Sequence, residues 1–181
     1  MSDDTYKELK SMKATLRYEG IVDLEAMFQM IHDWLTERHY KFHEKAHKKK
    51  PMERGFEHEV ELYGERKETD YVKFYVYVYI HAFYAEDVEI IENGVKKKMQ
   101  KVGTMIIQVY PGMVLDWQNR WESTPMKKKL RDFFHKYIIK TYINVLWLDR
   151  IYYISYKLHT KIKEFLDFQS KYNAWEDIWQ T

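Results

Sequence analysis

Residues 71–84 constrain the fold more than any other part of the chain. Apolar residues alternate there with aromatic and polar ones, and a period of two is the signature of a β-strand whose two faces differ. One face carries Val72, Phe74, Val76, Val78, Ile80 and Ala82, and the other carries Tyr71, Lys73, Tyr75, Tyr77, Tyr79, His81 and Phe83. Such a strand is typical of the middle of an antiparallel sheet, so we expect a sheet built around these residues.

Turn signals divide the neighbouring stretches into further strands. Asn93 and Gly94 tolerate the positive φ angles of a type I′ turn, so they predict a hairpin. Pro111 and Gly112 predict a second turn. The expected strands are residues 13–20, 56–62, 71–84, 88–92, 95–101, 103–110 and 113–121.

Two segments show the three- and four-residue spacing of amphipathic helices. Asp23 is a good N-cap, and the apolar residues after it predict a helix that continues to about Lys48, before Pro51. Thr124 begins a second helical pattern, which runs without glycine or proline to about residue 171. This second pattern predicts one very long C-terminal helix, or two helices with a bend.

Together these elements predict an α+β fold. An antiparallel sheet of six or seven strands wraps a long C-terminal helix, and one N-terminal helix is inserted after the first strand. We expect a polar lead-in at residues 1–12, a single domain at 13–172, and a tail at 173–181 that docks on the domain through Trp175 and Trp179.

This order of elements resembles the helix-grip superfamily, which includes the START and Bet v 1-like (SRPBCC) folds. The resemblance covers roughly residues 13–150, rests on element order alone, and implies a curved sheet that encloses an apolar cavity under the C-terminal helix. A glycine-rich loop found in some members is absent, and the last helix is longer than the pattern requires. The extra length suggests packing on a partner or on a second copy, and the second option would be a homodimer formed through the long C-terminal helix. An unrelated α+β sandwich, with the same helix on one sheet face, stays open.

Composition narrows the function classes. The chain has no cysteine, which excludes disulfides, iron–sulfur clusters, thiol nucleophiles and Cys-based zinc fingers. Its 30 Lys and Arg nearly balance 28 Asp and Glu, for a formal net charge of +2, a weak excess for a nucleic-acid-binding protein. The polar first residues indicate no signal peptide, and the charges within residues 137–158 argue against a membrane span. We expect a cytoplasmic protein.

The sharpest short motif is HExxH at residues 43–47. On a helix, His43 and His47 lie about 40° apart, so both can bind zinc while Glu44 acts as general base. The motif resembles that of the zincin metallopeptidases, which makes a zinc-dependent hydrolase one alternative function. It falls on a lysine-rich helix end, however, and spacing indicates no third ligand. The preferred interpretation is a half-buried helix flank with no cofactor.

Three lysine clusters form a further candidate surface. If the fold brought them together, they would bind phosphate groups of a nucleic acid or of an anionic membrane surface. An RNA- or ribosome-associated protein is therefore the second alternative function, although each cluster has a local explanation as solvated surface. The clusters are Lys48, Lys49 and Lys50; Lys96, Lys97 and Lys98; and Lys127, Lys128 and Lys129.

The preferred function follows from the aromatic excess, which includes 16 Tyr and 6 Trp. We expect a non-catalytic binding protein that holds a hydrophobic small molecule, or a partner protein, between the sheet and the C-terminal helix. Tyrosine hydroxyls would orient a mostly apolar ligand, although the same row is also typical of ordinary core packing. The candidate ligand-binding residues are Tyr71, Tyr75, Tyr77, Tyr79, His81, Trp117 and Tyr137.

Overall fold

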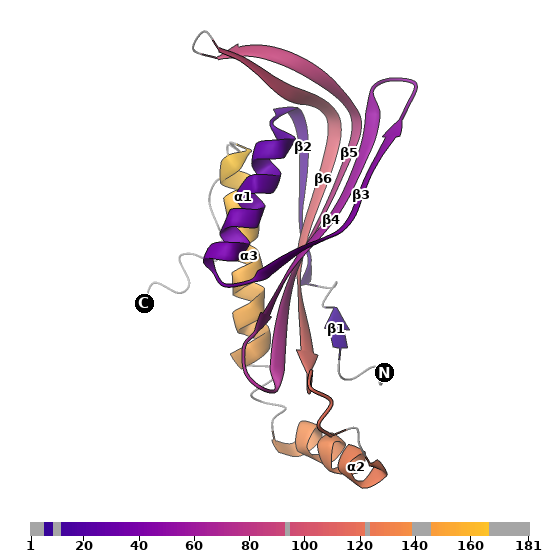
Figure 1. Ribbon diagram of the computed structural model, residues 1–181, viewed down its shortest axis with the longest axis vertical. Coiled ribbons are helices and arrows are strands. Elements are labelled where there is room, and N and C mark those ends of the chain that lie inside the picture. The colour runs from indigo at the N-terminus through magenta and orange to yellow at the C-terminus, as the bar shows by residue number, and fades with distance from the viewer. Residues whose placement is uncertain (1–5, 9–11, 93–94, 122–123, 139–145, 167–181) are drawn as a thin grey trace.

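The computed structural model of the protein describes residues 6–8, 12–92, 95–121, 124–138 and 146–166. It is an α+β structure in which an antiparallel sheet carries helices on one face (Figure 1). The elements are β1 (Tyr6–Glu8), β2 (Ala14–Val22), α1 (Leu24–Glu37), β3 (Lys41–Pro51), β4 (Phe56–Lys67), β5 (Val72–Glu92), β6 (Val95–Leu115), α2 (Pro125–Phe133), η2 (Phe134–Ile138) and α3 (Asp149–Phe165).

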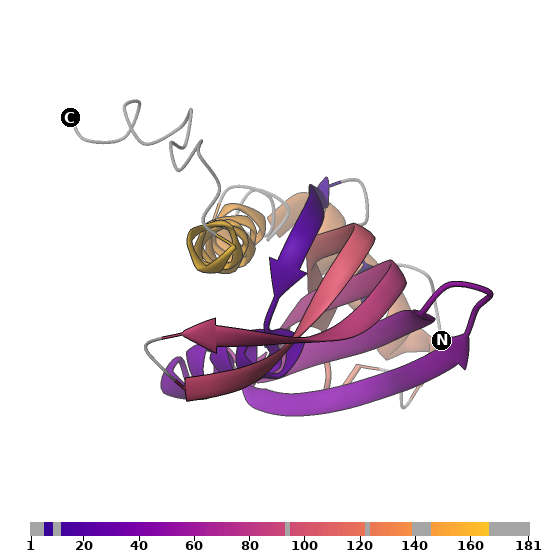
Figure 2. The same cartoon turned by 90° about the horizontal axis from the view of Figure 1, so that it is seen from above.

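The sheet has six strands but is only five strands wide. Its order is β1-β6-β5-β4-β3, and β2 pairs with the same edge of β6 as β1 does. Every pairing is antiparallel. Seen from above, the strands fan out, as expected of a twisted sheet (Figure 2). β1 lies within the segment predicted as a polar lead-in.

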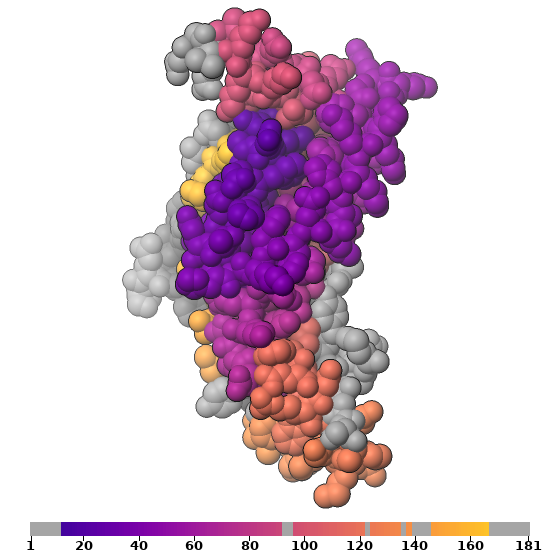
Figure 3. All heavy atoms as spheres, viewed as in Figure 1, coloured from indigo at the N-terminus to yellow at the C-terminus, as the bar shows by residue number. Residues whose placement is uncertain are grey.

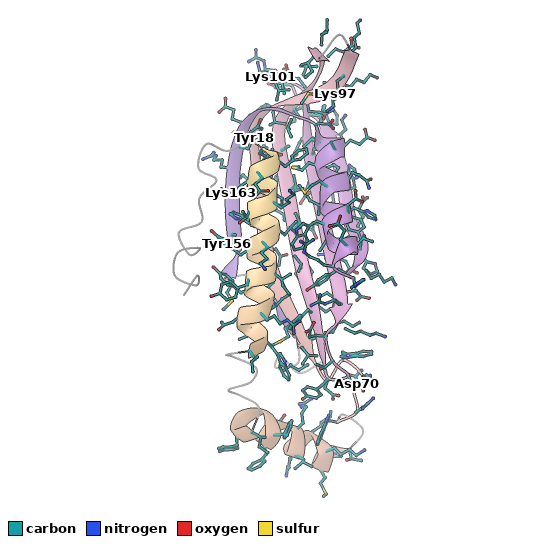
Figure 4. All side chains as sticks on the ribbon, turned by 90° about the vertical axis from the view of Figure 1, so that its left-hand side faces the viewer. Tyr18, Asp70, Lys97, Lys101, Tyr156 and Lys163 are labelled. Atoms are coloured by element: carbon teal, nitrogen blue, oxygen red, sulfur yellow. The ribbon has the colours of Figure 1, made fainter. Side chains whose placement is uncertain are left out.

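The core lies between the sheet and the two helices α1 and α3. Both helices lie on the same side of the sheet (Figures 1 and 4), and α3 packs against β5, β6, β2 and α1. The apolar face of β5 points toward them: Phe74 and Val76 are fully buried, as are Ile151, Leu158 and Ile162 of α3. The alternation at residues 71–84 therefore predicts correctly which side chains are buried.

The two central strands are longer than predicted. β5 and β6 each have 21 residues, and no turn separates the strands expected on either side of Pro111, which pairs with Val76 inside β6. The edge of β6 explains how a proline is tolerated there. Along this edge, β2 pairs with β6 as far as Val109, and the pairing with β1 starts at Gly112. Pro111, which has no N–H, lies between the two paired stretches, where no strand hydrogen bond is needed from it.

The N-terminal helix is shorter than predicted. Asp23 caps α1 as expected, since its carboxylate accepts a hydrogen bond from the amide of Ala26 at 2.9 Å. The helix ends at Glu37, however, and residues 41–51 form the edge strand β3. The prediction of a helix to Lys48 is therefore wrong. The backbone of His39 has a φ of +60°, which takes the chain out of the helix.

The prediction for residues 124–171 left open one very long helix or two with a bend, and the described residues contain separate helical segments, α2 with η2 and α3. Thr124 caps α2 through its hydroxyl, and Pro125 occupies the first turn, both as predicted. α2 continues into η2, and both lie apart from α3 at one end of the molecule (Figure 1). The Asn93-Gly94 turn and the Trp-containing tail at 173–181 lie outside the described residues. Among the described helices, none has the length and apolar character needed to cross a membrane.

Candidate functional site

The sheet face that points away from α1 and α3 is rich in aromatic rings. Side chains alternate along each strand, so the residues next to the buried positions of β5 are on this opposite face and are half-buried. The same face continues onto β3, β4 and β6. We define the tyrosine face as His43, Tyr63, Tyr75, Tyr77, Tyr79, His81 and Tyr110.

Four of these rings form a straight row across four strands. His43, Tyr63, Tyr77 and Tyr110 are direct register partners on β3, β4, β5 and β6. Their ring centroids are separated by 4.7, 5.8 and 5.1 Å in that order. Tyr75 stacks beside Tyr77, with centroids 5.9 Å apart. Cross-strand aromatic pairs of this kind stabilise a sheet, and here they also build a continuous platform.

A polar cluster borders the row on one side. The hydroxyl of Tyr79 donates to Glu59 at 3.2 Å, and His81 Nε2 lies 2.6 Å from Glu57. Burial, together with the negative charge of Glu59, raises the pKa of Tyr79 above its usual value. The phenol therefore stays protonated at neutral pH and acts as a hydrogen-bond donor.

Three lysines around the tyrosine face lie beside glutamates. Lys45 lies 2.7 Å from Glu61, and Lys73 lies 3.4 Å from Glu65. Lys48 lies 3.3 Å from Glu59. The face therefore offers rings, hydroxyl groups and several lysines whose charge a carboxylate compensates.

The structure gathers only part of the ligand-binding set predicted from the sequence. Tyr75, Tyr77, Tyr79 and His81 lie together, but on the sheet face opposite to the helices. The expected position of these rings between the sheet and the C-terminal helix is therefore wrong. The face that the helices cover carries the apolar residues of the same strand.

The other three predicted ligand-binding residues have separate environments. Trp117 borders the tyrosine face, because the ammonium group of Lys73 lies 5.2 Å from its ring and 5.9 Å from that of Tyr75. Tyr71 packs against the hydrophobic core, and burial raises its pKa to about 12. Tyr137 lies on η2 and is 64% exposed. Only Trp117 extends the candidate site.

The HExxH residues do not converge. They lie on β3, whose register with β4 shifts between Glu44 and Ala46. This shift is a β-bulge, and beyond it the alternation of side chains between the two sheet faces is reversed. His43 stacks on Tyr63 on the tyrosine face. His47 contacts Phe28 of α1 on the helix side, with ring centroids 6.0 Å apart. The two histidines therefore lie on opposite faces of the sheet.

His47 instead meets His58 of the neighbouring strand, with their Nε2 atoms 2.5 Å apart. Burial, and secondly the proximity of His47, lower the pKa of His58 to about 4. Among the described residues, no three His, Asp or Glu side chains are placed to hold a metal ion.

The lysine cluster at residues 127–129 lies far from the one at residues 96–98. Lys97 is at the tip of the β5–β6 hairpin, whereas α2, with Lys127–Lys129, is at the opposite end of the molecule (Figure 4). Lys97 also pairs with Asp23 at 3.0 Å, and Lys49 lies 3.8 Å from Asp87. The clusters do not combine into one basic patch.

Sequence reasoning did not place His43, Tyr63 and Tyr110 among the ligand-binding residues, although it named His43 as a candidate metal ligand. Tyr110 could have been found from the hairpin. A two-residue turn at 93–94 pairs Glu92 with Val95, and the same register pairs Tyr77 with Tyr110. Nothing comparable indicates His43, since the bulge that positions it has no clear sequence signal.

No protein-family model matches the chain, and a comparison with curated proteins finds no matching sequence.

Proposed function

We propose that this protein is a non-catalytic binding protein that recognises a partner protein through its tyrosine face. The observation that carries the proposal is the row of four rings in direct register across β3, β4, β5 and β6. The row lies on the side of the sheet that neither α1 nor α3 covers (Figures 1 and 4).

Tyrosine is suited to this role. It offers a large, rigid apolar ring and a hydroxyl group that forms hydrogen bonds, and it is enriched among the residues that dominate protein–protein binding energy. The flat platform and its border of paired charges match an interface with an apolar centre and a polar rim. The half-buried rings are held by their neighbours, which reduces the entropy that binding costs.

Packing favours this face over the space beneath the C-terminal helix. Phe74, Ile107 and Leu158 meet in one cluster of fully buried side chains between sheet and helix. A hydrophobic small molecule held there would have to displace part of the core. A partner on the tyrosine face displaces only water.

The charges favour a protein over RNA as the partner. Bases could stack on the tyrosine row, but RNA binding depends on cations that neutralise phosphates. Lys45, Lys48 and Lys73 each lie beside a glutamate. A phosphate backbone would meet these carboxylates as well as the lysines.

Element order supports a helix-grip-like relationship as part of the proposal. From β2 to α3 the order is a strand, a helix and four antiparallel strands, then α2 with η2, and last the helix α3. This is the order on which the resemblance rests, with fewer strands than the sequence predicts. Fold likeness alone implies no ligand.

The test begins with photo-crosslinking in cells that produce the protein. A benzoylphenylalanine placed at position 77 is compared with one at position 153, where a tyrosine on α3 is 41% exposed. We expect a protein captured from position 77 alone. Its affinity for the purified protein is then measured by calorimetry.

The double variant Tyr77→Thr/Tyr110→Thr keeps two good strand formers but removes the centre of the row. We expect Kd to rise at least about 30-fold, which corresponds to about 2 kcal/mol. Tyr153→Gln is the matched control and leaves Kd unchanged. Equal crosslinking from both positions, or an unchanged Kd in the double variant, would refute the proposal. An apolar ligand detected by native mass spectrometry, and retained by the double variant, would favour a site under the helix instead.

A further inference from the structure

The helix α2 and its continuation η2 project from one end of the molecule, away from the sheet (Figure 3). Among the described elements, the main contacts of α2 are with η2. A surface helix of a globular protein normally turns its apolar stripe toward a core. Of the described residues of α2, Arg131 is buried, whereas the apolar ones are exposed.

The apolar residues of this helix are nevertheless arranged as a stripe. Met126, Leu130, Phe133 and Tyr137 follow one another at steps of four, three and four, and their exposed fractions are 80, 51, 53 and 64%. Within α2, at about 100° per residue, Met126, Leu130 and Phe133 fall within an arc of roughly 60°, and Tyr137 follows on η2. A contiguous exposed patch of such residues marks a binding surface.

Lysines flank the stripe. Lys127, Lys128 and Lys129 occupy the first turn, which contains no acidic residue. The positive end of the helix dipole makes this the least favourable place for three cations. At about 100° per residue, Lys127 and Lys129 lie on either side of the stripe. A surface rich in negative charge would stabilise both the lysines and the end of the helix.

We propose that α2 and η2 bind the surface of an anionic lipid bilayer. The stripe inserts its apolar side chains at the level of the headgroups, and Lys127 and Lys129 reach the lipid phosphates on both sides. This combination of an apolar stripe and flanking lysines is what interfacial helices use. From Met126 to Tyr137 the stripe extends about 17 Å, too short to cross a hydrocarbon layer of about 30 Å. The helix therefore lies on the membrane.

Charge also distinguishes the bilayer from a second copy of the chain. A second copy would meet this stripe with a helix that carries four cationic residues and one acidic one, so it would add positive charge to the interface, whereas an anionic bilayer adds negative charge. The proposal is independent of the tyrosine face, which is on a different element and binds a different class of partner.

The test is sedimentation of the full chain with vesicles. One set contains phosphatidylcholine alone, and the other includes roughly one third phosphatidylserine. We expect binding to the anionic vesicles, weakened by added salt. The variant Lys127→Gln/Lys128→Gln/Lys129→Gln should bind at least tenfold more weakly, and so should Leu130→Ser/Phe133→Ser. The melting temperature should change little, because the substituted side chains are all exposed.

The matched control is Lys96→Gln/Lys97→Gln/Lys98→Gln, which removes the same charge at the opposite end of the molecule. It should retain most of the binding. If both lysine variants lost vesicle binding equally, the binding would come from general attraction between the positive charges of the protein and the anionic lipids, and not from α2. This result would overturn the proposal. Failure of the full chain to bind anionic vesicles at low salt would also overturn it. A dimer in sedimentation velocity that the Leu130→Ser/Phe133→Ser variant abolishes, without vesicle binding, would assign the stripe to a second copy.

Discussion

Individual residues on the tyrosine face depend on one another through close packing. The ring of Tyr77 lies over Gly112, where a Cβ atom would come within 2.6 Å of the Tyr77 Cε2 atom. Gly112 is the register partner of Tyr75. A residue without a side chain is thus what allows Tyr77 to extend across the sheet.

Gly112→Ala should therefore displace the ring of Tyr77 without removing it. We expect a loss of stability of about 1–3 kcal/mol, the usual cost of overpacking, and weaker binding of the partner protein. The ring resonances of Tyr77 and Tyr110 in an NMR spectrum report the displacement. Gly103→Ala in the same strand is the control, since its nearest neighbour is 3.2 Å away, at the Cβ of Tyr84. Unchanged resonances in Gly112→Ala would contradict the packing described here.

His159 should make the stability of the protein depend on pH. It is 7% exposed, and its Nδ1 atom has no hydrogen-bond partner. Burial, and secondly Lys163, lower its pKa from an ordinary value of 6.5 to about 4. Between these two values the unfolded chain takes up a proton that the folded protein does not. Stability is therefore lost as the pH falls from about 6.5 toward 4.

His159→Leu should reduce this pH dependence. Denaturant unfolding followed at several pH values between 4 and 7 measures it, and we expect a shallower fall for the variant than for the natural chain. Part of the fall should remain, because the pKa of His58 is lowered in the same direction. His32→Gln removes an exposed histidine and should retain the steeper fall. A variant curve parallel to that of the natural chain would show that His159 plays no part.

At the scale of whole elements, the periodicity of apolar residues predicted correctly whether a segment is helix or strand where one face of that segment is buried. It failed at the edge strand of the sheet. β3 was missed because its edge position leaves most of its side chains exposed, and its run of lysines hides any alternation. Lysines are common on edge strands because they oppose pairing with another chain. The apolar spacing of residues 124–171 did indicate helix, but the stripe of α2 faces outward while that of α3 faces the core.

The cap of α1 links that helix to the β5–β6 hairpin. Asp23 accepts a hydrogen bond from the amide of Ala26 and also lies 3.0 Å from Lys97. Asp23→Ala should cost about 1–2 kcal/mol, mostly from loss of the cap, whereas Asp23→Ser restores the cap without the ion pair. Chemical denaturation measures both variants. If Asp23→Ser proves as unstable as Asp23→Ala, then the ion pair and not the cap is what matters.

For the molecule as a whole, a single hydrophobic core joins the sheet to α1 and α3. Leu158 is fully buried in it, so Leu158→Ala should cost about 2–5 kcal/mol. Circular dichroism and tryptophan fluorescence should give coincident transitions, because one core implies cooperative unfolding. Lys161→Ala, an exposed change on the same helix, should have an effect below about 0.5 kcal/mol. Separate transitions would show that α3 unfolds on its own.

The sequence was sufficient for the fold class, the buried face of β5 and the start of α1, since each depends on local patterns. It was not sufficient for the side of the sheet on which the helices pack. Either face of residues 71–84 could have met a helix, because tyrosine packs well in a core and also at an interface. The row from His43 to Tyr110 needs the register of three strand pairs, which the residues of one strand do not reveal.

The separation of the two faces of β5 means that its neighbouring positions experience different selective pressures. Substitutions at even positions from 72 to 82 change a packed interior, while those at odd positions from 73 to 83 leave that interior intact. In a library that samples every amino acid at each position and selects only for folding, tolerance should therefore alternate from one residue to the next. The exposed face of β5 can then change in sequence with little cost to the architecture.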